Sequence, residues 1–184
     1  MSKGVAEKRT PTPSVRGILA VSLPILVAGI ALDRISKYLV TVYLKGSTPV
    51  ELIPGVLRLR YSENTGAAFS MLEGQRWFFL VLTVLVLGIA VYALVRGWVR
   101  NLFGVASIAC CISGAVGNFV DRLVQGYVVD MIEPTFMRFA VFNVADSFLT
   151  VGCILLAVYL LFFHEQLAPK ESSAEAEEDP KEGK

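Results

Sequence analysis

Histidine is almost absent from this sequence. His164 is the only one among 184 residues, which rules out zinc motifs such as H-E-x-x-H and makes a Ser-His hydrolase inside a membrane hard to build. Cysteine is also rare. Cys110, Cys111 and Cys153 do not have the spacing of zinc ligands, so we interpret them as small packing residues. We expect neither a metal nor another cofactor.

The sequence also lacks an excess of either charge. Lys and Arg number 17 and Asp and Glu number 16, which gives a formal net charge of +1. This balance argues against a nucleic-acid partner, because no basic stripe is available to neutralise phosphates.

Apolar residues, in contrast, make up 54% of the chain, too many for an ordinary soluble domain. The surplus must face lipid. Four apolar segments each approach the roughly 20 residues that a helix needs to cross a hydrocarbon layer of about 30 Å. They cover residues 15–32, 77–95, 102–120 and 146–163. The expected fold is a mainly α membrane protein, a bundle of four transmembrane helices.

The chain divides into one membrane domain, residues 15–166, and two polar ends. Residues 1–14 contain proline, and residues 167–184 are acidic and lack aromatic residues, so both ends are predicted to be disordered. The third span is rich in Gly, Ala, Ser and Cys, which lets neighbouring helices approach closely. It is the expected centre of the bundle.

A long connection, residues 41–76, separates the first two spans. Its segment VLRLRYS alternates between apolar and polar residues, the period of a half-buried strand, and turn residues lie on both sides of it. We predict a small β-sheet on the outer membrane surface. The loop that follows this strand is a candidate lid.

Positive charge predicts the orientation. The N-terminal segment and the link between the second and third spans are basic, which places both, and therefore both ends of the chain, in the cytoplasm. The basic residues are Lys3, Lys8, Arg9, Arg16, Arg96 and Arg100. Lys45, Arg58, Arg60 and Arg76 in the first outer loop argue the other way. The first span is too long for a cleavable signal peptide and lacks a small-x-small site, so we interpret it as a retained anchor.

Polar residues gather at the outer ends of the spans. With four alternating spans, all of them fall at one membrane depth. They are Asp33, Lys37, Asn64, Asn118, Asp121, Arg122, Asp130, Asn143 and Asp146. Asn118, Asp121 and Arg122 share a helix face because they are three and four residues apart. The segment 124–145 forms a single outer hairpin whose ends carry Asp130 and Asp146, so these two carboxylates can meet.

Most of these residues also have a structural interpretation. Asp146 can cap the fourth helix. Asp121 and Arg122 can form an interfacial ion pair, and Asp33 with Lys37 is an i,i+4 pair that can stabilise the bundle. Asn64 can be a turn residue.

Asp130 is harder to explain structurally, because apolar residues flank it and no basic residue is adjacent in sequence. Two aspartates brought together cannot easily both ionise, so the pair shares a proton. One carboxylate can then activate water while the other protonates the scissile carbonyl or the leaving amine. This is a route to peptide hydrolysis without Ser, Cys or metal.

Five motifs in order, DRISK, ENTGAAF, GNFVDR, VVDMI and FNVADSFLTVG, resemble those of lipoprotein signal peptidase, also called signal peptidase II. This family comprises bacterial aspartic proteases that remove signal peptides from prolipoproteins. The resemblance covers about residues 17–163. It implies that Asp130 and Asp146 are the catalytic dyad.

The resemblance also implies roles for the other polar residues. It assigns substrate binding to Asn64, Gly66, Asn118, Arg122 and Asn143. It assigns structural support to Asp33, Lys37 and Asp121. Arg122 is the best candidate to bond substrate carbonyls, because its guanidinium is a permanent multiple donor.

Three positions depart from the pattern of the resembled family. Arg34 stands where the family often has Gln, Met131 where an aromatic residue is common, and Ala140 where Pro is common. None touches the dyad, so these departures concern loop shape and substrate preference.

The substrate implied by the resemblance is a prolipoprotein whose cysteine carries diacylglycerol and is cleaved just before that cysteine. Its partners would be this precursor and the lipids of the bacterial cytoplasmic (inner) membrane, with the protein a monomer. Two other classes remain open from the residues alone. One is a non-catalytic scaffold or lipid-binding protein. The other is a transporter, against which the lack of broken helices at mid-membrane argues.

Overall fold

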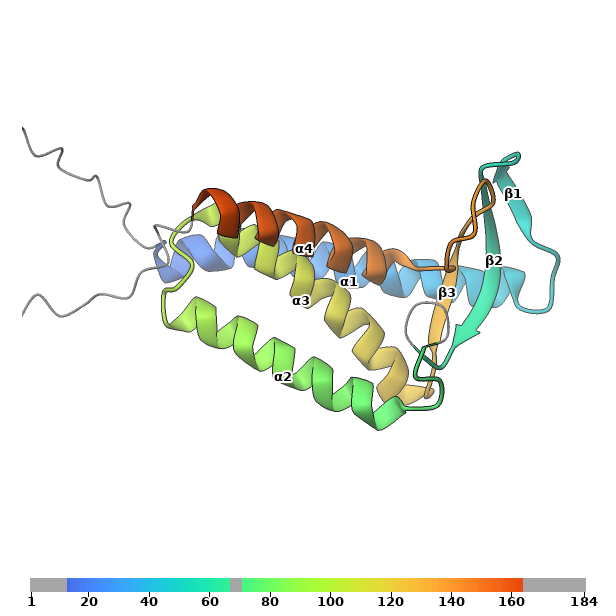
Figure 1. Ribbon diagram of the computed structural model, residues 1–184, viewed down its shortest axis with the longest axis horizontal. Helices are drawn as coiled ribbons and strands as arrows, with labels where there is room; N and C mark the ends of the chain where they lie inside the picture. Colours follow the sequence, from blue (N-terminus) through green and yellow to red (C-terminus); the bar gives the residue numbers. More distant parts are fainter. Residues whose placement is uncertain (1–12, 67–70, 164–184) are drawn as a thin grey trace, which may run out of the picture.

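The computed structural model describes residues 13–66 and 71–163. Four of its helices are long and apolar enough to cross a membrane. They are α1 (Val15–Leu44), α2 (Arg76–Val95), α3 (Leu102–Val124) and α4 (Val144–Phe162). Figure 1 shows them side by side, with a small sheet across one end of the bundle. The predicted four-helix membrane fold is confirmed, whereas the two ends predicted to be disordered lie outside the described residues, apart from Pro13 and Ser14.

The first helix is longer than predicted. We expected it to end at residue 32 and the outer insert to begin near residue 41, but α1 continues to Leu44. No glycine or proline lies between Gly29 and Gly46, so no residue breaks the helix near residue 32. Asp33 and Lys37 therefore lie inside α1, not at its end, and both are buried. At about 1.5 Å per residue, the helix is about 45 Å long and reaches past the hydrocarbon layer to the sheet.

Helix α3 lies at the centre of the bundle, as predicted. Half of its most apolar stretch is buried, compared with 6% of that of α2. Small residues make this packing possible. A Cβ added at Gly114 would lie 2.7 Å from the Leu149 nitrogen and would collide with the Ala145 carbonyl oxygen of α4.

We therefore expect Gly114→Ala to lower the free energy of unfolding by about 1 to 3 kcal/mol, because the backbones of α3 and α4 must separate. Gly88→Ala is the matched control: apart from the nearby backbone of α2 itself and the adjacent residues, no described atom lies within 4 Å of a Cβ added at Gly88. Thermal unfolding in detergent compares the two variants. Equal melting temperatures would contradict this close approach of α3 and α4.

The sheet contains three antiparallel strands in the order β1, β2, β3. Their bounds are β1 (Val50–Ile53), β2 (Leu57–Asn64) and β3 (Val128–Pro134). The predicted strand corresponds to β2, and the small sheet is confirmed. Strand β3 was not predicted; we had treated residues 124–145 as one outer hairpin. Its first four residues are all buried, so it lacks the alternation that identified β2.

Candidate active site

The segment between β3 and α4 folds back on itself. The Phe142 nitrogen donates to the Ile132 oxygen at 3.0 Å, and the Ile132 nitrogen donates to the Phe142 oxygen at 2.8 Å. This bridge places the residue after Phe142, Asn143, next to β3. The Met131 nitrogen also donates to the Phe142 oxygen at 3.0 Å, so three backbone hydrogen bonds bring the two ends of the predicted hairpin together.

Helix α4 begins with a reciprocal cap. The Asn143 side chain accepts from the Asp146 nitrogen at 2.9 Å, and the Asp146 carboxylate accepts from the Asn143 nitrogen at 3.1 Å. Such a cap satisfies free N–H groups in the first turn. The predicted helix cap is thus partly confirmed: Asp146 takes part in the capping box, but the N-cap residue itself is Asn143. The cap also fixes the direction of the Asp146 side chain.

Three asparagine side chains hold the two carboxylates. Asn143 donates to Asp130 Oδ1 at 2.7 Å, and Asn64 donates to Asp130 Oδ2 at 2.9 Å. Asn118 donates to Asp146 Oδ1 at 2.6 Å. All four carboxylate oxygens thus accept from an N–H group, counting the Asn143 nitrogen on Asp146. A proton on the pair must therefore use a remaining lone pair.

Burial and the neighbouring Asp146 carboxylate raise the pKa of Asp130 to about 6. Burial is the larger cause, because an apolar surrounding disfavours the charged form. Only 2% of Asp130 is exposed. The hydrogen bonds from Asn64 and Asn143 oppose this rise. The carboxyl group is consequently able to hold a proton near neutral pH.

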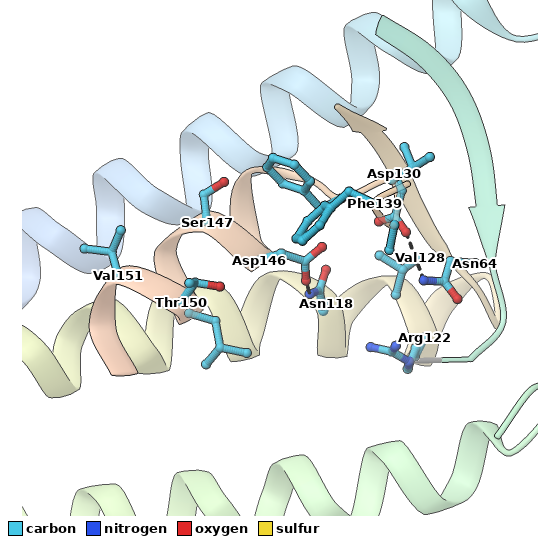
Figure 2. Close-up of a pocket in the computed structure, with 14 residues that line it drawn as sticks. Asn64, Asn118, Arg122, Val128, Asp130, Phe139, Asp146, Ser147, Thr150 and Val151 are labelled. Carbon is cyan, nitrogen blue, oxygen red and sulfur yellow. Dashed lines mark hydrogen bonds between the residues drawn. The ribbon is translucent and has the colours of Figure 1, made fainter. Parts of the chain in front are cut away.

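Both aspartates line one cavity of about 450 Å³ (Figure 2). Its polar end carries Asn64, Asn118, Arg122 and the two carboxylates. From there it continues along α4 past apolar residues such as Leu149 and Val151. In the described ranges, 13–66 and 71–163, no group of three His, Cys, Asp or Glu side chains is arranged to hold a metal ion.

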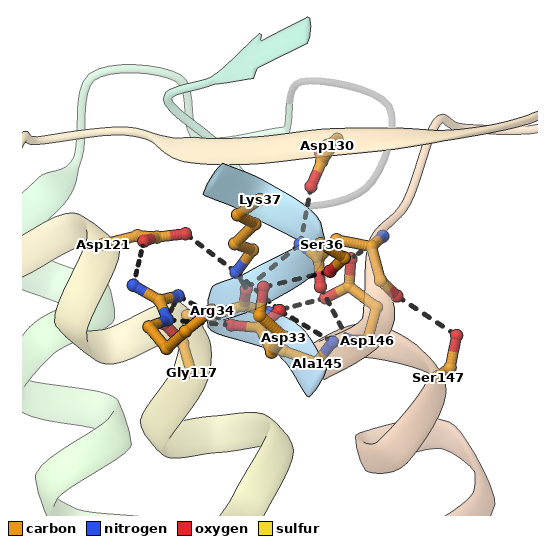
Figure 3. A network of polar contacts seen from close by, with 12 residues as sticks. Asp33, Arg34, Ser36, Lys37, Gly117, Asp121, Asp130, Ala145, Asp146 and Ser147 are labelled. Atoms are coloured by element: carbon orange, nitrogen blue, oxygen red, sulfur yellow. Dashed lines mark hydrogen bonds and ion pairs between the residues drawn. The ribbon is translucent and has the colours of Figure 1, made fainter. Parts of the chain in front are cut away.

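A buried ionic cluster lies beside this cavity (Figure 3). Lys37 Nζ lies 3.0 Å from Asp33 Oδ1 and 2.7 Å from Asp121 Oδ2. Arg34 Nη1 lies 2.7 Å from Asp121 Oδ1, and Arg34 Nη2 lies 2.6 Å from Asp33 Oδ2. The Asp33–Lys37 pair is confirmed. The predicted Asp121–Arg122 pair is wrong, because Asp121 instead forms ion pairs with Arg34 and Lys37 of α1.

The ionic cluster is connected to the dyad by two contacts. Lys37 Nζ donates to Asn118 Oδ1 at 3.0 Å, and Asn118 in turn donates to Asp146. Asp33 Oδ1 accepts from the Ala145 nitrogen at 3.1 Å, in the first turn of α4. Arg34 was missed as a site residue. Two of its partners, Asp121 and the Gly117 oxygen, lie on α3, and adjacent residues in the sequence do not indicate this long-range pairing.

Arg122 approaches the cavity from α3. Its Nη2 donates to the Gly66 oxygen at 2.8 Å, and its guanidinium lies 4.7 Å from the centre of the Phe79 ring. Its Nε is buried and finds no acceptor among the described residues. Gly66 is thus held at the rim of the site. The proposed lid includes residues 67–70, which lie outside the described residues.

The predicted site residues are therefore brought together. Asn64, Asn118, Arg122, Asp130 and Asp146 line the cavity, and Asn143 bridges the two aspartates from a fully buried position. Asp33, Lys37 and Asp121 form the cluster behind them. Because Asn118 and Asn143 already bond protein groups on both sides, they have little capacity left for a ligand.

Comparisons with known proteins point to one family. A sequence model of the family described as "Signal peptidase (SPase) II" matches residues 25–162. The chain is 47% identical over 141 residues to the lipoprotein signal peptidase of Streptococcus thermophilus (strain CNRZ 1066), covering 76% of this chain and 92% of the relative. It is 47% identical over 135 residues to that of Streptococcus pyogenes serotype M2 (strain MGAS10270), covering 73% and 89%.

The fold is also similar to solved structures. One is described as "Bacterial membrane enzyme structure by the in meso method at 2.3 A resolution" and superimposes with a TM-score of 0.74 at 34% identity, over 89% of this chain and 96% of that one. A second, determined by the same method at 1.9 Å, gives a TM-score of 0.73 at 33% identity, over 85% and 99%.

Proposed function

The chain belongs to the signal peptidase II family, and from this premise we propose that it is an aspartic endopeptidase acting on diacylglyceryl-modified prolipoproteins. Membership makes it a multi-pass bacterial membrane enzyme that removes signal peptides from prolipoproteins. The proposal adds the catalytic groups, Asp130 and Asp146, and the cleavage position, just before the lipidated cysteine. The observation that carries it is the pair of buried carboxylates on one cavity, each held by asparagine donors.

The dyad would act with one shared proton. The ionised carboxylate takes a proton from water as the water oxygen bonds to the scissile carbonyl carbon, and the protonated carboxyl donates to the carbonyl oxygen. The carbon–nitrogen bond then breaks as the amine takes up a proton from one carboxyl, while a hydroxyl of the tetrahedral diol returns its proton to the other carboxylate and restores the shared proton. The raised pKa of Asp130 supports this role, because one carboxyl must stay protonated near neutral pH.

We assign the remaining residues two kinds of role. Arg122 and Asn64 lie on the cavity wall, and the unbonded Nε of Arg122 makes it suited to bind a substrate carbonyl. Gly66 contributes by anchoring Arg122 through its oxygen. Asn118 and Asn143 orient the carboxylates instead of binding substrate, since their amides are already bonded to the dyad.

The proposed setting follows from the positive-inside rule. Both ends of the chain would lie in the cytoplasm, and the dyad would lie at the outer face of the inner membrane, where the scissile bond of an inserted signal peptide emerges. We propose a monomer, because both aspartates and their donors come from one chain.

The decisive experiment uses the purified full-length chain and a diacylated model precursor in detergent. Mass spectrometry should detect a new N-terminus at the lipidated cysteine. A precursor without the diacylglyceryl group is the control. Failure to cleave the diacylated precursor would contradict the proposal and would favour a scaffold or lipid-binding role.

The pH dependence provides a second test. Because the active dyad holds one proton, kcat/KM should fall in acid, where both carboxyls are protonated and none can accept a proton from water. It should fall again as the pH rises through the pKa of Asp130, about 6. Initial rates between about pH 4 and about pH 9 reveal both limbs. A rate that increases in proportion to hydroxide, or that chelators abolish, would contradict the shared proton.

A further inference from the structure

A second, smaller cleft lies next to Asp130. It holds about 220 Å³ and lies over the sheet, where the main cavity lies along the bundle. The two share a wall formed by Asn64, Asp130 and residues 139–141. The main cavity is mostly apolar along α4, whereas the lining of the second cleft includes Arg60, Ser62, Glu63 and Glu133.

Asp130 lines both spaces, so a substrate bound at this carboxyl group would extend into each of them. A signal peptide is apolar, so the apolar cavity along α4 suits the part that precedes the scissile bond. The residues that follow the bond are the start of a secreted, soluble chain. The polar cleft also adjoins Asp130 and suits this part of the substrate.

Arg60 is the cationic residue in the lining of this cleft, and the two glutamates of the lining have other cationic or hydroxyl partners. Glu63 has its own partners, Lys45 at 3.0 Å and the Tyr61 hydroxyl at 2.7 Å. Glu133 is held by both Nε and Nη2 of Arg58, at 2.7 and 3.1 Å.

Arg60 Nε lies 3.1 Å from Glu133 Oε2, the oxygen that already accepts from Arg58 Nε. The Arg60 Nε is buried and has no acceptor in hydrogen-bond geometry among the described residues. Its side chain is still 41% exposed. Arg60 can therefore take a second carboxylate without breaking the Arg58–Glu133 pair.

We propose that this polar cleft, lined by Arg60, Ser62, Glu63, Asn64, Asp130 and Glu133, is the subsite for the first residues of the mature lipoprotein. Within it, Arg60 favours a segment that carries a carboxylate side chain shortly after the lipidated cysteine. The inference rests on the proposed function and adds to it a preference on the far side of the scissile bond.

The test uses two diacylated precursors that differ only in the second residue after the cysteine, Glu in one and Gln in the other. The wild-type chain should cleave the Glu precursor with a kcat/KM about three-fold higher, the size expected for one partly exposed ion pair. Arg60→Gln should lose the preference for Glu, so that its kcat/KM values for the two precursors become about equal. Raising the salt concentration should also weaken the preference.

Arg138→Gln is the matched control. Arg138 lines a separate outer cleft with Arg58 and Glu133 but not the one at the dyad, and its loss changes the net charge equally. This variant should keep the preference. If Arg60→Gln keeps it as well, or if the wild type shows none, the subsite is wrong while the protease assignment stands. If neither precursor is cleaved, the proposed function fails and the subsite fails with it.

Discussion

Asp130→Asn and Asp146→Asn are each expected to lower the rate of precursor cleavage by at least about three orders of magnitude, because the dyad loses the carboxylate that exchanges a proton with water or substrate. An asparagine has nearly the same shape but cannot take or give that proton. The measurement is the initial rate of cleavage of a diacylated precursor by each purified variant. The double variant should be about as inactive as either single one, because the two groups act as a unit.

The structure also predicts what these variants do to stability. In the wild type, each carboxylate accepts hydrogen bonds with both oxygens, so an asparagine NH2 group faces a donor at one of these positions. The cost is about 1 to 3 kcal/mol, which leaves the variants folded but less stable. Thermal unfolding in detergent tests this. Glu51→Gln, on the exposed strand β1, is the control and should change neither property. Normal cleavage by both asparagine variants would disprove the aspartyl mechanism.

The sequence predicts those parts of the fold whose length is set by the thickness of the membrane. Uninterrupted apolar runs fix the four spans, since backbone polar groups in lipid must be satisfied within a helix. The end of α1 was not predictable from the same rule. Its last turns carry Asp33, Arg34 and Lys37, which look like the edge of a span. They stay inside the helix because Asp121 of α3 completes a buried, neutral cluster.

The sequence predicts which residues lie at the site but not which partners their side chains bond. The spacing of Asn118, Asp121 and Arg122 and the hairpin between Asp130 and Asp146 placed these residues at one depth. The spacing does not determine which group each of these side chains bonds. Asp121 turns to α1, and Arg122 turns to the Gly66 oxygen. Such long-range choices depend on side-chain packing between helices, not on neighbours in sequence.

Lys37→Met is expected to lower the free energy of unfolding by about 3 to 5 kcal/mol, because it removes one partner of a buried ionic cluster. Lys37 Nζ forms ion pairs with Asp33 and Asp121 and donates a hydrogen bond to the Asn118 oxygen. Methionine fills a similar volume but leaves two buried carboxylates with only Arg34. Thermal unfolding should show a fall in melting temperature of about 10 °C. Lys45→Met is the matched control, because the exposed Lys45–Glu63 pair contributes less than about 1 kcal/mol. Equal effects of the two substitutions would contradict the cluster.

A second substitution separates the two consequences of losing Lys37. Lys37→Met combined with Asp121→Asn has one carboxylate, Asp33, for one cation, Arg34, so the charge balance is restored and part of the lost stability should return. Cleavage should not recover to the same extent. The Asn118 oxygen still lacks its Lys37 donor, and the Asn118 amide that bonds Asp146 is then less firmly oriented. If stability and activity recover together, Lys37 acts only by balancing charge; if activity alone stays low, Lys37 also positions the dyad through Asn118.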